Sequence, residues 1–531
     1  MEPDSSQRLL HPVSALSRPA ADPDRAIRRA GDSPQIPGNT VSLLRDGPAV
    51  FASWLADIAQ AQRFILIENY IFRSDRIGHQ IADALIERAH AGIEVYVLFD
   101  WLGSLGTSRT LWVKLQRAGA RVRPFRSLRL TDPLRLLQRN HRKVLCIDGQ
   151  IGHVGGLCIG DAWAGHPERG LAPWRDTAIR FAGPAAIELC HAFAQTWQAS
   201  GASLPERIQH PVPTSPMDRV QPVDQVTTEQ RPEQRPEQRP EQLEATPCAN
   251  APLRVVSGLP GRSRIYRLTQ VLLANAAERI WITDAYFLTP PTMYEALTAA
   301  ARDGVDVRVL VPGRSDLPWI SWLSRAGYLG LLEAGVRIFE WQGPMLHAKT
   351  TVVDGKWCRV GSSNLNLASL LTNWELDVVV EDESFGRAAE QMFLSDLQNS
   401  RELHLRTRRM RLGTHDAAVA TETEPARPQA PKTQPVLVGG RAGAVVVRAS
   451  AAVLGVALRR RYERSAWSVS IVSALLLLSL GTVGFVAPQG LGLGIAGLCV
   501  WFGLGALLRG IADWRHNRKK SRRARRESRA E

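Results

Sequence analysis

Two short stretches of the chain carry the same pattern of residues, and these residue types suit chemistry on a phosphate group. Residues 141–148 and 347–354 both read His-x-Lys, then four residues, then Asp. In each copy a glycine-containing segment begins seven positions after the Asp. A His and a Lys two positions apart on a β-strand face the same side, so both can meet one phosphate. The residues concerned are His141, Lys143 and Asp148 in the first copy, and His347, Lys349 and Asp354 in the second.

Two imidazoles and two ammonium groups meet the needs of phosphodiester transfer. Negative oxygens shield the phosphorus, so a neutral imidazole suits the nucleophile and would form a phosphohistidine. A second imidazole can protonate the departing alcohol and then deprotonate the incoming one. Lys143 and Lys349 would neutralise the non-bridging oxygens, with Ser362 and Asn364 helping to bind the phosphate. This chemistry requires no metal ion and no cofactor, and the two motifs alone do not tell which histidine attacks.

The segments around the motifs are also duplicated, which predicts two similar halves. The β-rich run 64–72 corresponds to 280–287, and the run 92–99 corresponds to 304–311. Apolar, β-branched runs that alternate with helical patterns indicate βαβ units. The predicted fold class is therefore α/β, with two sandwich-like halves whose sheets are mostly parallel and covered on both faces.

Changes in composition divide the chain into seven parts. Prolines at every fourth position in the repeat Glu-Gln-Arg-Pro forbid a regular helix between the halves. The predicted layout is a disordered N-terminal segment 1–37, a first half 38–204, a Pro-rich linker 205–250, a second half 251–406, a linker and juxtamembrane segment 407–464, a transmembrane hairpin 465–508 and a basic cytosolic tail 509–531.

With its two motifs the chain resembles the phospholipase D superfamily, in particular the bacterial cardiolipin synthase branch. The resemblance extends from Gly38 to Leu405, and includes the pair Gly38-Asn39, the strand 68–72 and the segment 174–176. It implies a membrane phosphatidyltransferase that makes cardiolipin from phosphatidylglycerol or a related phospholipid.

The resemblance also assigns roles to residues. It implies that His141 is the nucleophile and His347 the general acid and base. In this family the acid that orients a histidine lies downstream of the motif and serves the histidine of the other half. This implies Glu375 for His141 and Asp176 for His347; as an alternative, both are ordinary acids at strand ends. Asp148 and Asp354 complete the catalytic motifs, and we expect them to hold the turn that follows each one.

One position departs from the pattern. Asn364 closes the second motif, but its counterpart in the first is Cys158. Because a thiol is a poor hydrogen-bond donor, the two sides of the phosphate are expected to be held unequally, unless the replacement is neutral.

Charge and hydropathy predict a membrane partner. The formal charge is +15, and residues 509–531 contribute +7 of it, from ten Lys or Arg and three acids. This tail follows two apolar runs, 467–487 and 491–508, separated by an uncharged turn. Basic flanks on both sides predict a hairpin with cytosolic ends, and hence catalytic halves on the cytosolic side of the bacterial inner membrane. Alternatives are a hairpin lying within one leaflet and a buried hairpin of a soluble protein.

Further observations bound the class of protein. None of the six cysteines forms a CxxC pair, so neither disulfides nor a zinc site are expected, and residues 1–37 do not read as a signal peptide. We expect an anionic membrane and phospholipid substrates as partners, and no nucleic acid. A phospholipase D that releases phosphatidic acid, a nuclease and an inactive membrane scaffold remain as alternatives. The sequence leaves the oligomeric state open.

Overall fold

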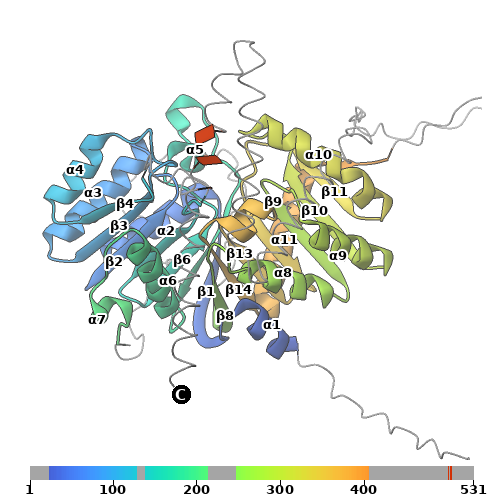
Figure 1. Ribbon diagram of the computed structural model, residues 1–531, viewed down its shortest axis with the longest axis horizontal. Helices are drawn as coiled ribbons and strands as arrows, with labels where there is room; N and C mark the ends of the chain where they lie inside the picture. Colours follow the sequence, from blue (N-terminus) through green and yellow to red (C-terminus); the bar gives the residue numbers. More distant parts are fainter. Residues whose placement is uncertain are drawn as a thin grey trace, which may run out of the picture.

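The computed structural model describes residues 23–127, 138–212 and 247–405, and five scattered residues between 500 and 507. In these ranges, two units with the same order of elements follow each other along the chain. Figure 1 shows the first unit, blue to teal, beside the second, green to orange, with strands of both in the centre. The predicted duplicated α/β fold is confirmed.

Both units are built from the same alternation of strands and helices. The first comprises β1 (Ile36–Arg45), α2 (Asp46–Ala59), β2 (Phe64–Asn69), α3 (Arg76–His90), β3 (Glu94–Asp100), α4 (Arg109–Arg117), β4 (Arg121–Phe125), β5 (Lys143–Ile147), β6 (Ile151–Gly155), α5 (Asp161–Ala164), β7 (Thr177–Ala182), α6 (Ala186–Ala199) and α7 (Glu206–Gln209). The second comprises β8 (Cys248–Gly258), α8 (Arg264–Ala274), β9 (Arg279–Asp284), α9 (Pro291–Arg302), β10 (Asp306–Pro312), α10 (Pro318–Glu333), β11 (Arg337–Trp341), β12 (Lys349–Val353), β13 (Trp357–Gly361), a π-helical turn (Ala368–Thr372), β14 (Glu375–Glu381), α11 (Glu383–Gln398) and β15 (Ser400–Leu403).

All fifteen of these strands belong to one sheet, in the order β15-β11-β10-β9-β12-β13-β14-β8-β1-β7-β6-β5-β2-β3-β4. Outward from the central pair β8–β1, both units repeat one strand order, so the two motif strands β5 and β12 occupy equivalent places. The sheet is mixed: β2, β3 and β4 pair in parallel, as do β9, β10 and β11, whereas the other neighbours are antiparallel. The prediction of two mostly parallel sheets is therefore wrong.

The turns after the two motifs explain this difference. Asp148 and Gly149 have φ of 55° and 70°, and Asp354 and Gly355 have φ of 52° and 63°. Two successive residues with positive φ form the tight turn of a β-hairpin, which joins antiparallel strands only. A parallel pair needs a crossover of a dozen or more residues, and the segments that contain α3, α4, α9 and α10 are the crossovers of the four parallel pairs.

The ends of the units differ from the predicted boundaries. Helix α1 (Pro23–Gly31) and the start of β1 fall within the segment 1–37, so its predicted disorder is wrong for residues 23–37. Ile27 of α1 is buried in the core of the second unit, which is why this polar stretch is ordered. Helix α7 and the first residues of β8 likewise extend into the linker predicted at 205–250.

The core joins the two units. One cluster of buried side chains contains Val41 and Val144 of the first unit together with Val255, Val352 and Val378 of the second. Helices α2, α3 and α4 cover a second cluster, and α8, α9 and α10 cover a third. Because the two units share a core, the loops at the ends of β5 and β12 have fixed positions relative to each other.

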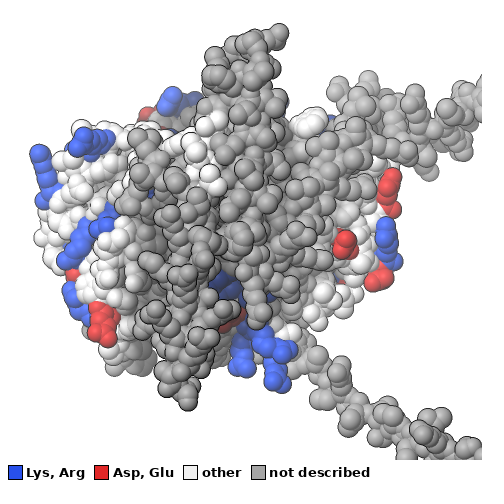
Figure 2. Space-filling view, in the orientation of Figure 1, with Lys and Arg blue, Asp and Glu red and all other residues white. Residues whose placement is uncertain are grey.

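The predicted membrane segments lie outside the described residues, apart from the five scattered positions. Within the described ranges, no helix is both long and apolar enough to cross a bilayer. On the face shown in Figure 2, Lys and Arg gather along the edge formed by α3 and α4 and around α1. The last turns of α1 and α4 contribute Arg28, Arg29, Lys114 and Arg117.

Candidate active site

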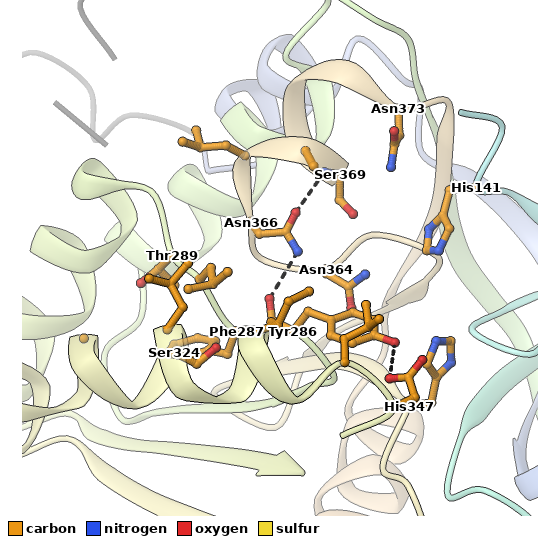
Figure 3. Close-up of a pocket in the computed structure, with 18 of the residues that line it drawn as sticks. His141, Tyr286, Phe287, Thr289, Ser324, His347, Asn364, Asn366, Ser369 and Asn373 are labelled. Carbon is orange, nitrogen blue, oxygen red and sulfur yellow. Dashed lines mark hydrogen bonds between the residues drawn. The ribbon is translucent and has the colours of Figure 1, made fainter. Parts of the chain in front are cut away.

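The two motif histidines, 206 positions apart in the sequence (347 − 141), line one cavity. Each lies two residues before a central strand, His141 before β5 and His347 before β12. Figure 3 shows both rings at the same end of the cavity, one above the other. The cavity has a volume of about 1490 Å³. A single phosphate can therefore approach one imidazole from each unit.

Backbone hydrogen bonds between the units hold each histidine. The N–H of His141 donates to the carbonyl of Trp374 at 2.9 Å, and the N–H of His347 donates to the carbonyl of Arg175 at 2.7 Å. Trp374 directly precedes β14, and Arg175 lies two residues before β7. Each histidine is therefore held beside the segment of the opposite unit that carries its carboxylate. This pairing fixes the crossed geometry described next.

A buried carboxylate of the opposite unit contacts each imidazole. Both oxygens of Glu375 lie 3.1 Å from Nδ1 of His141, and Oδ2 of Asp176 lies 2.7 Å from Nδ1 of His347. Both carboxylates are fully buried. With Nδ1 occupied in this way, Nε2 of each ring is left for chemistry. The two contacts are the ones that the family resemblance implies.

The two carboxylates have different electrostatic environments. Burial alone would raise the pKa of Glu375, but the charge and hydrogen bond of His141, with help from Lys143 and the Ser362 hydroxyl, lower it. Burial raises the pKa of Asp176 to about 6, although Lys349 favours its ionised form. The counterpart of Ser362 is Gly156, where a Cβ would lie 2.2 Å from Oδ1 of Asp176. A glycine there makes room for Asp176 but supplies no hydroxyl to it.

The two lysines lie behind the histidines. Lys143 and Lys349 are buried and are not among the residues that line the cavity. Nζ of Lys143 donates to the carbonyl of His141 at 2.6 Å, and Nζ of Lys349 donates to the carbonyl of His347 and lies 2.9 Å from its Nδ1. Direct contact with a phosphate therefore requires the amines to turn away from these carbonyls.

Burial and like charges act on the basic groups of the site. Burial lowers the pKa of Lys143, and it lowers the pKa of Lys349 to about 8 against the opposing charge of Asp176. Burial also lowers the pKa of both histidines, and for His347 the two lysines add to the effect. Both imidazoles are thus neutral at neutral pH, as a nucleophile must be. A phosphate anion between them would raise both pKa values, since opposite charge favours the imidazolium.

Asp148 and Asp354 lie at the other ends of the motif strands. Asp148 accepts hydrogen bonds from the backbone N–H groups of Gln62, Arg63 and Phe64, at 2.8 Å each. Asp354 accepts from Ala277, Glu278 and Arg279, also at 2.8 Å each. Seven residues of extended chain, about 23 Å, separate each one from its motif histidine. Their contacts are those of an anchor for the hairpin turn.

Cys158, which stands where the second motif has Asn364, lies at the wall of the cavity. Cys158 and Asn364 both line it, whereas Ser362 is fully buried behind it. Burial raises the pKa of the Cys158 thiol, which keeps it neutral beside Lys143. The side-chain oxygen of Asn364 is buried and has no hydrogen-bond partner among the described residues. As an acceptor it suits a substrate hydroxyl, whereas a phosphate oxygen requires the Nδ2 group of the same side chain.

Aromatic side chains complete the surroundings of both histidines, and the sequence interpretation did not assign them. The ring of Tyr70 lies edge-on to His141 with a centroid distance of 5.0 Å, and Tyr286 lies edge-on to His347 at 6.0 Å. Trp163 and Trp174 contact His347 at 5.6 and 5.7 Å. A tyrosine follows the first strand of the repeat in both halves, at 70 and 286, so the duplication itself gave the signal for that pair.

Comparisons with known proteins agree with this geometry. Residues 54–161 and 270–397 match the family model described as "Cardiolipin synthase, PLD-like domain". The chain is 33% identical over 387 residues to cardiolipin synthase A of Pseudomonas aeruginosa, covering 72% of each chain, and 30% identical over 368 residues to cardiolipin synthase 2 of Staphylococcus epidermidis, covering 69% of each. The fold is similar to that of a phosphatidylserine synthase from Haemophilus influenzae, with a TM-score of 0.52 at 14% identity over 72% of this chain and 92% of that one.

The fold and the facing histidines define a two-unit enzyme of the phospholipase D type. The similarity in sequence covers both units and both motifs, and the chain belongs to the cardiolipin synthase family. The predicted superfamily and branch are therefore confirmed, as is the prediction that the chain is an enzyme of phosphatidyl transfer.

Proposed function

We propose that this enzyme transfers a phosphatidyl group from phosphatidylglycerol, or a related phospholipid, to the glycerol hydroxyl of another phosphatidylglycerol, which gives cardiolipin. The observation that carries the proposal is the pair of imidazoles, one from each unit, that line one cavity with a buried carboxylate at each Nδ1. The relatives are named as cardiolipin synthases. The names of the relatives thus supply the substrate of the proposal, and the site supplies the class of reaction.

In the first step Nε2 of His141 attacks the phosphorus of the donor. The bond from phosphorus to the glycerol oxygen breaks. His347, which holds a second proton on Nε2 once the bound phosphate anion has raised its pKa, gives that proton to the oxygen. Glu375 stabilises the positive charge that His141 acquires, and Asp176 holds His347 in the tautomer that presents Nε2. The products are free glycerol and a phosphatidyl group bonded to His141.

In the second step His347, now neutral, takes the proton of the acceptor hydroxyl. The acceptor oxygen attacks phosphorus, and the bond to His141 breaks. Lys143 and Lys349 place two positive charges behind the reacting centre, and the Asn364 amide faces it from the cavity wall. These groups stabilise the negative charge that builds up on the non-bridging oxygens. Asp148 and Asp354 contribute by fixing the motif strands rather than by contact with substrate.

For localisation we propose the cytosolic leaflet of the bacterial inner membrane, with an anionic lipid surface as partner. The support is the pair of apolar runs in 465–508, the +7 charge of 509–531, and the basic groups of α1 and α4. A tag placed in the turn at 488–490 tests this arrangement. Digestion of the tag by protease added from outside is expected, and its protection would contradict a hairpin that spans the membrane.

The function is tested by expressing the protein in bacteria that lack their own cardiolipin synthases. Lipid extracts should contain cardiolipin with the natural chain, and none with His141→Ala or His347→Ala at equal protein levels. Phosphatidic acid without cardiolipin would instead identify a hydrolase that uses water as acceptor. Asp83→Asn, a change on the outward-facing part of α3, is a matched control that should leave the cardiolipin level unchanged.

A further inference from the structure

The cavity is much larger than a phosphate requires, and most of it lies on one side of the histidines. From His347 it passes Tyr286 and Phe287 and continues between α9 and α10 of the second unit. Figure 3 shows this arm to the left of the two histidine rings. The wall of the arm is formed mainly by apolar side chains, including Leu288, Pro291, Leu317, Ile320, Leu323 and Leu331.

The direction of the chain shows which end of this groove lies at the active site and which end lies away from it. Helices α9 and α10 each follow a parallel strand whose carboxyl end lies at the active site, so both helices begin there and end at the far side of the sheet. Charged lining residues lie at both ends of the groove. Asp316, just before α10, accepts a hydrogen bond from the Tyr286 hydroxyl near the histidines, and Arg302 and Glu333 are the last residues of α9 and α10. The apolar side chains of the groove lie between these two ends.

Two glycines of α10 line the groove, and they differ in what surrounds them. A Cβ at Gly330 would lie 2.1 Å from the hydroxyl of Tyr294 on α9, so this glycine allows the helices to approach. A Cβ at Gly327 would meet nothing within 4 Å, so nothing in the packing demands glycine there. Glycine in a helix interior is unfavourable by comparison with alanine. Gly327 is explained if the space above it has to remain free for a ligand.

Among the described residues of the first unit, aromatic side chains fill the equivalent place. There Trp112 of α4 stacks on Phe99 with a centroid distance of 4.0 Å and contacts Phe72 at 5.2 Å. The first-unit residues that line the cavity lie on the loops around the histidines and on α5, and none of them belongs to α3 or α4. In the described residues, the groove is thus a property of the second unit, although the two units share one fold.

We propose that this groove binds one acyl chain of the donor phospholipid, an inference that rests on the proposed function. The length of α9, twelve residues or about 18 Å, matches a chain that spans one leaflet of a hydrocarbon core about 30 Å thick. The donor is the occupant because its diacylglycerol part stays bonded to phosphorus through both steps. The leaving glycerol and the acceptor, by contrast, must exchange while the phosphatidyl group stays in place.

Filling the groove tests this assignment. Gly327→Leu and the milder Gly327→Ala place a side chain in the open space, and Ala299→Leu adds the same group at an exposed position of α9 outside the groove. The readout is kcat/KM for phosphatidylglycerol with long and with six-carbon acyl chains, measured as the incorporation of isotope-labelled free glycerol into the lipid. The ratio of the two values is compared within each purified, folded variant. A buried methylene contributes about a fourfold factor, so we expect Gly327→Leu to lower this ratio at least about tenfold, Gly327→Ala less, and Ala299→Leu not at all.

Other results overturn the assignment. An unchanged ratio in Gly327→Leu is one such result. A second is a lost dependence on acceptor chain length when long-chain and six-carbon phosphatidylglycerol replace glycerol as acceptors, which would place the acceptor in the groove. Equal loss with both donors in a folded variant would make Gly327 part of the reacting centre. A natural enzyme that transfers neither donor would refute the proposed function and not the groove. Binding of long-chain phosphatidylglycerol, measured without turnover, then gives the same comparison between Gly327→Leu and Ala299→Leu.

Discussion

The change Glu375→Gln removes the charge beside His141 while it keeps the shape of the side chain. Both oxygens of Glu375 lie 3.1 Å from Nδ1 of His141. Two unit charges at 3.1 Å interact by about 5 kcal/mol at an effective dielectric constant of about 20. The charge on the ring is shared by two nitrogens, and the carbonyl of Ser362, also 3.1 Å away, accepts from Nδ1 as well. We therefore assign about half of the interaction, about 2.7 kcal/mol, to the carboxylate, which corresponds to a roughly 100-fold lower rate of attack.

A donor with p-nitrophenol as leaving group isolates the step in which this charge develops. Nitrophenolate departs without a proton, so the rate of its release in the first turnover, before the phosphatidyl group leaves His141, reports the attack of His141 and not proton transfer by His347. Glu375→Gln is expected to slow this release roughly 100-fold. The matched change at the other histidine, Asp176→Asn, should slow turnover of phosphatidylglycerol strongly but nitrophenol release by less than about threefold.

Equal rates of nitrophenol release in the two variants would contradict the different roles of Glu375 and Asp176. A slower release in Asp176→Asn than in Glu375→Gln would also contradict them, because His347 and not His141 would then be the attacking group. Melting temperatures of both variants, compared with that of the natural chain, show whether the loss of rate comes from the chemistry or from unfolding.

Four other predictions follow from the contacts of the site. The value of kcat/KM should rise with pH as Asp176 ionises, with an apparent pKa of about 6, and fall as Lys349 loses its proton, with an apparent pKa of about 8. A flat profile between pH 5 and 9 would contradict the proposed roles of both groups. Gly156→Ser places a Cβ 2.2 Å from Asp176, so turnover should fall at least about 100-fold as the carboxylate is displaced from His347; activity near the natural level would show that Asp176 does not need that space. Asp148→Ala removes the acceptor of three backbone N–H groups at a residue with φ of 55°. Urea denaturation should therefore show a free energy of unfolding that is lower by about 2–4 kcal/mol, while kcat per folded molecule is retained. A normal stability with a lost kcat would show that Asp148 takes part in catalysis. Cys158→Asn adds an amide at the cavity wall and should raise kcat/KM about fivefold, the effect of one hydrogen bond of about 1 kcal/mol; an unchanged value would mean that this position does not tune catalysis.

The site was predictable from sequence because its groups repeat at fixed spacing. The two copies of His-x-Lys give the chemistry, and the family resemblance supplied the crossed pairing of Glu375 with His141 and of Asp176 with His347. Local patterns cannot supply that pairing, since the partners are 234 and 171 positions apart and meet only through the shared core. The large arm of the cavity was not predictable for the same reason. The arm exists because residues such as Gly327 place no side chain in the space between α9 and α10.

The direction of the strands was missed although a local signal was present. Buried strands such as β2 read as continuous apolar runs, which is also typical of parallel sheets. The pair Asp148-Gly149, repeated at Asp354-Gly355, is a hairpin signal that outweighs this pattern, because a turn of this kind joins antiparallel strands only. The order of residues 23–37 was missed because it rests on a few buried residues in a polar stretch, among them Ile27, Ala30 and Ser33, and the partners of Ile27 and Ser33 lie in the second unit.

The most direct test of the account is to identify the residue that carries the phosphatidyl group. The enzyme is mixed with a short-chain donor, and the reaction is stopped within milliseconds by alkali, because a phosphohistidine survives in alkali. The peptides of the enzyme are then analysed by mass spectrometry. The account predicts a phosphatidyl adduct on His141, with more of it in Asp176→Asn, where transfer to the acceptor is slowed. An adduct on His347, or turnover with no adduct on either histidine, would contradict it.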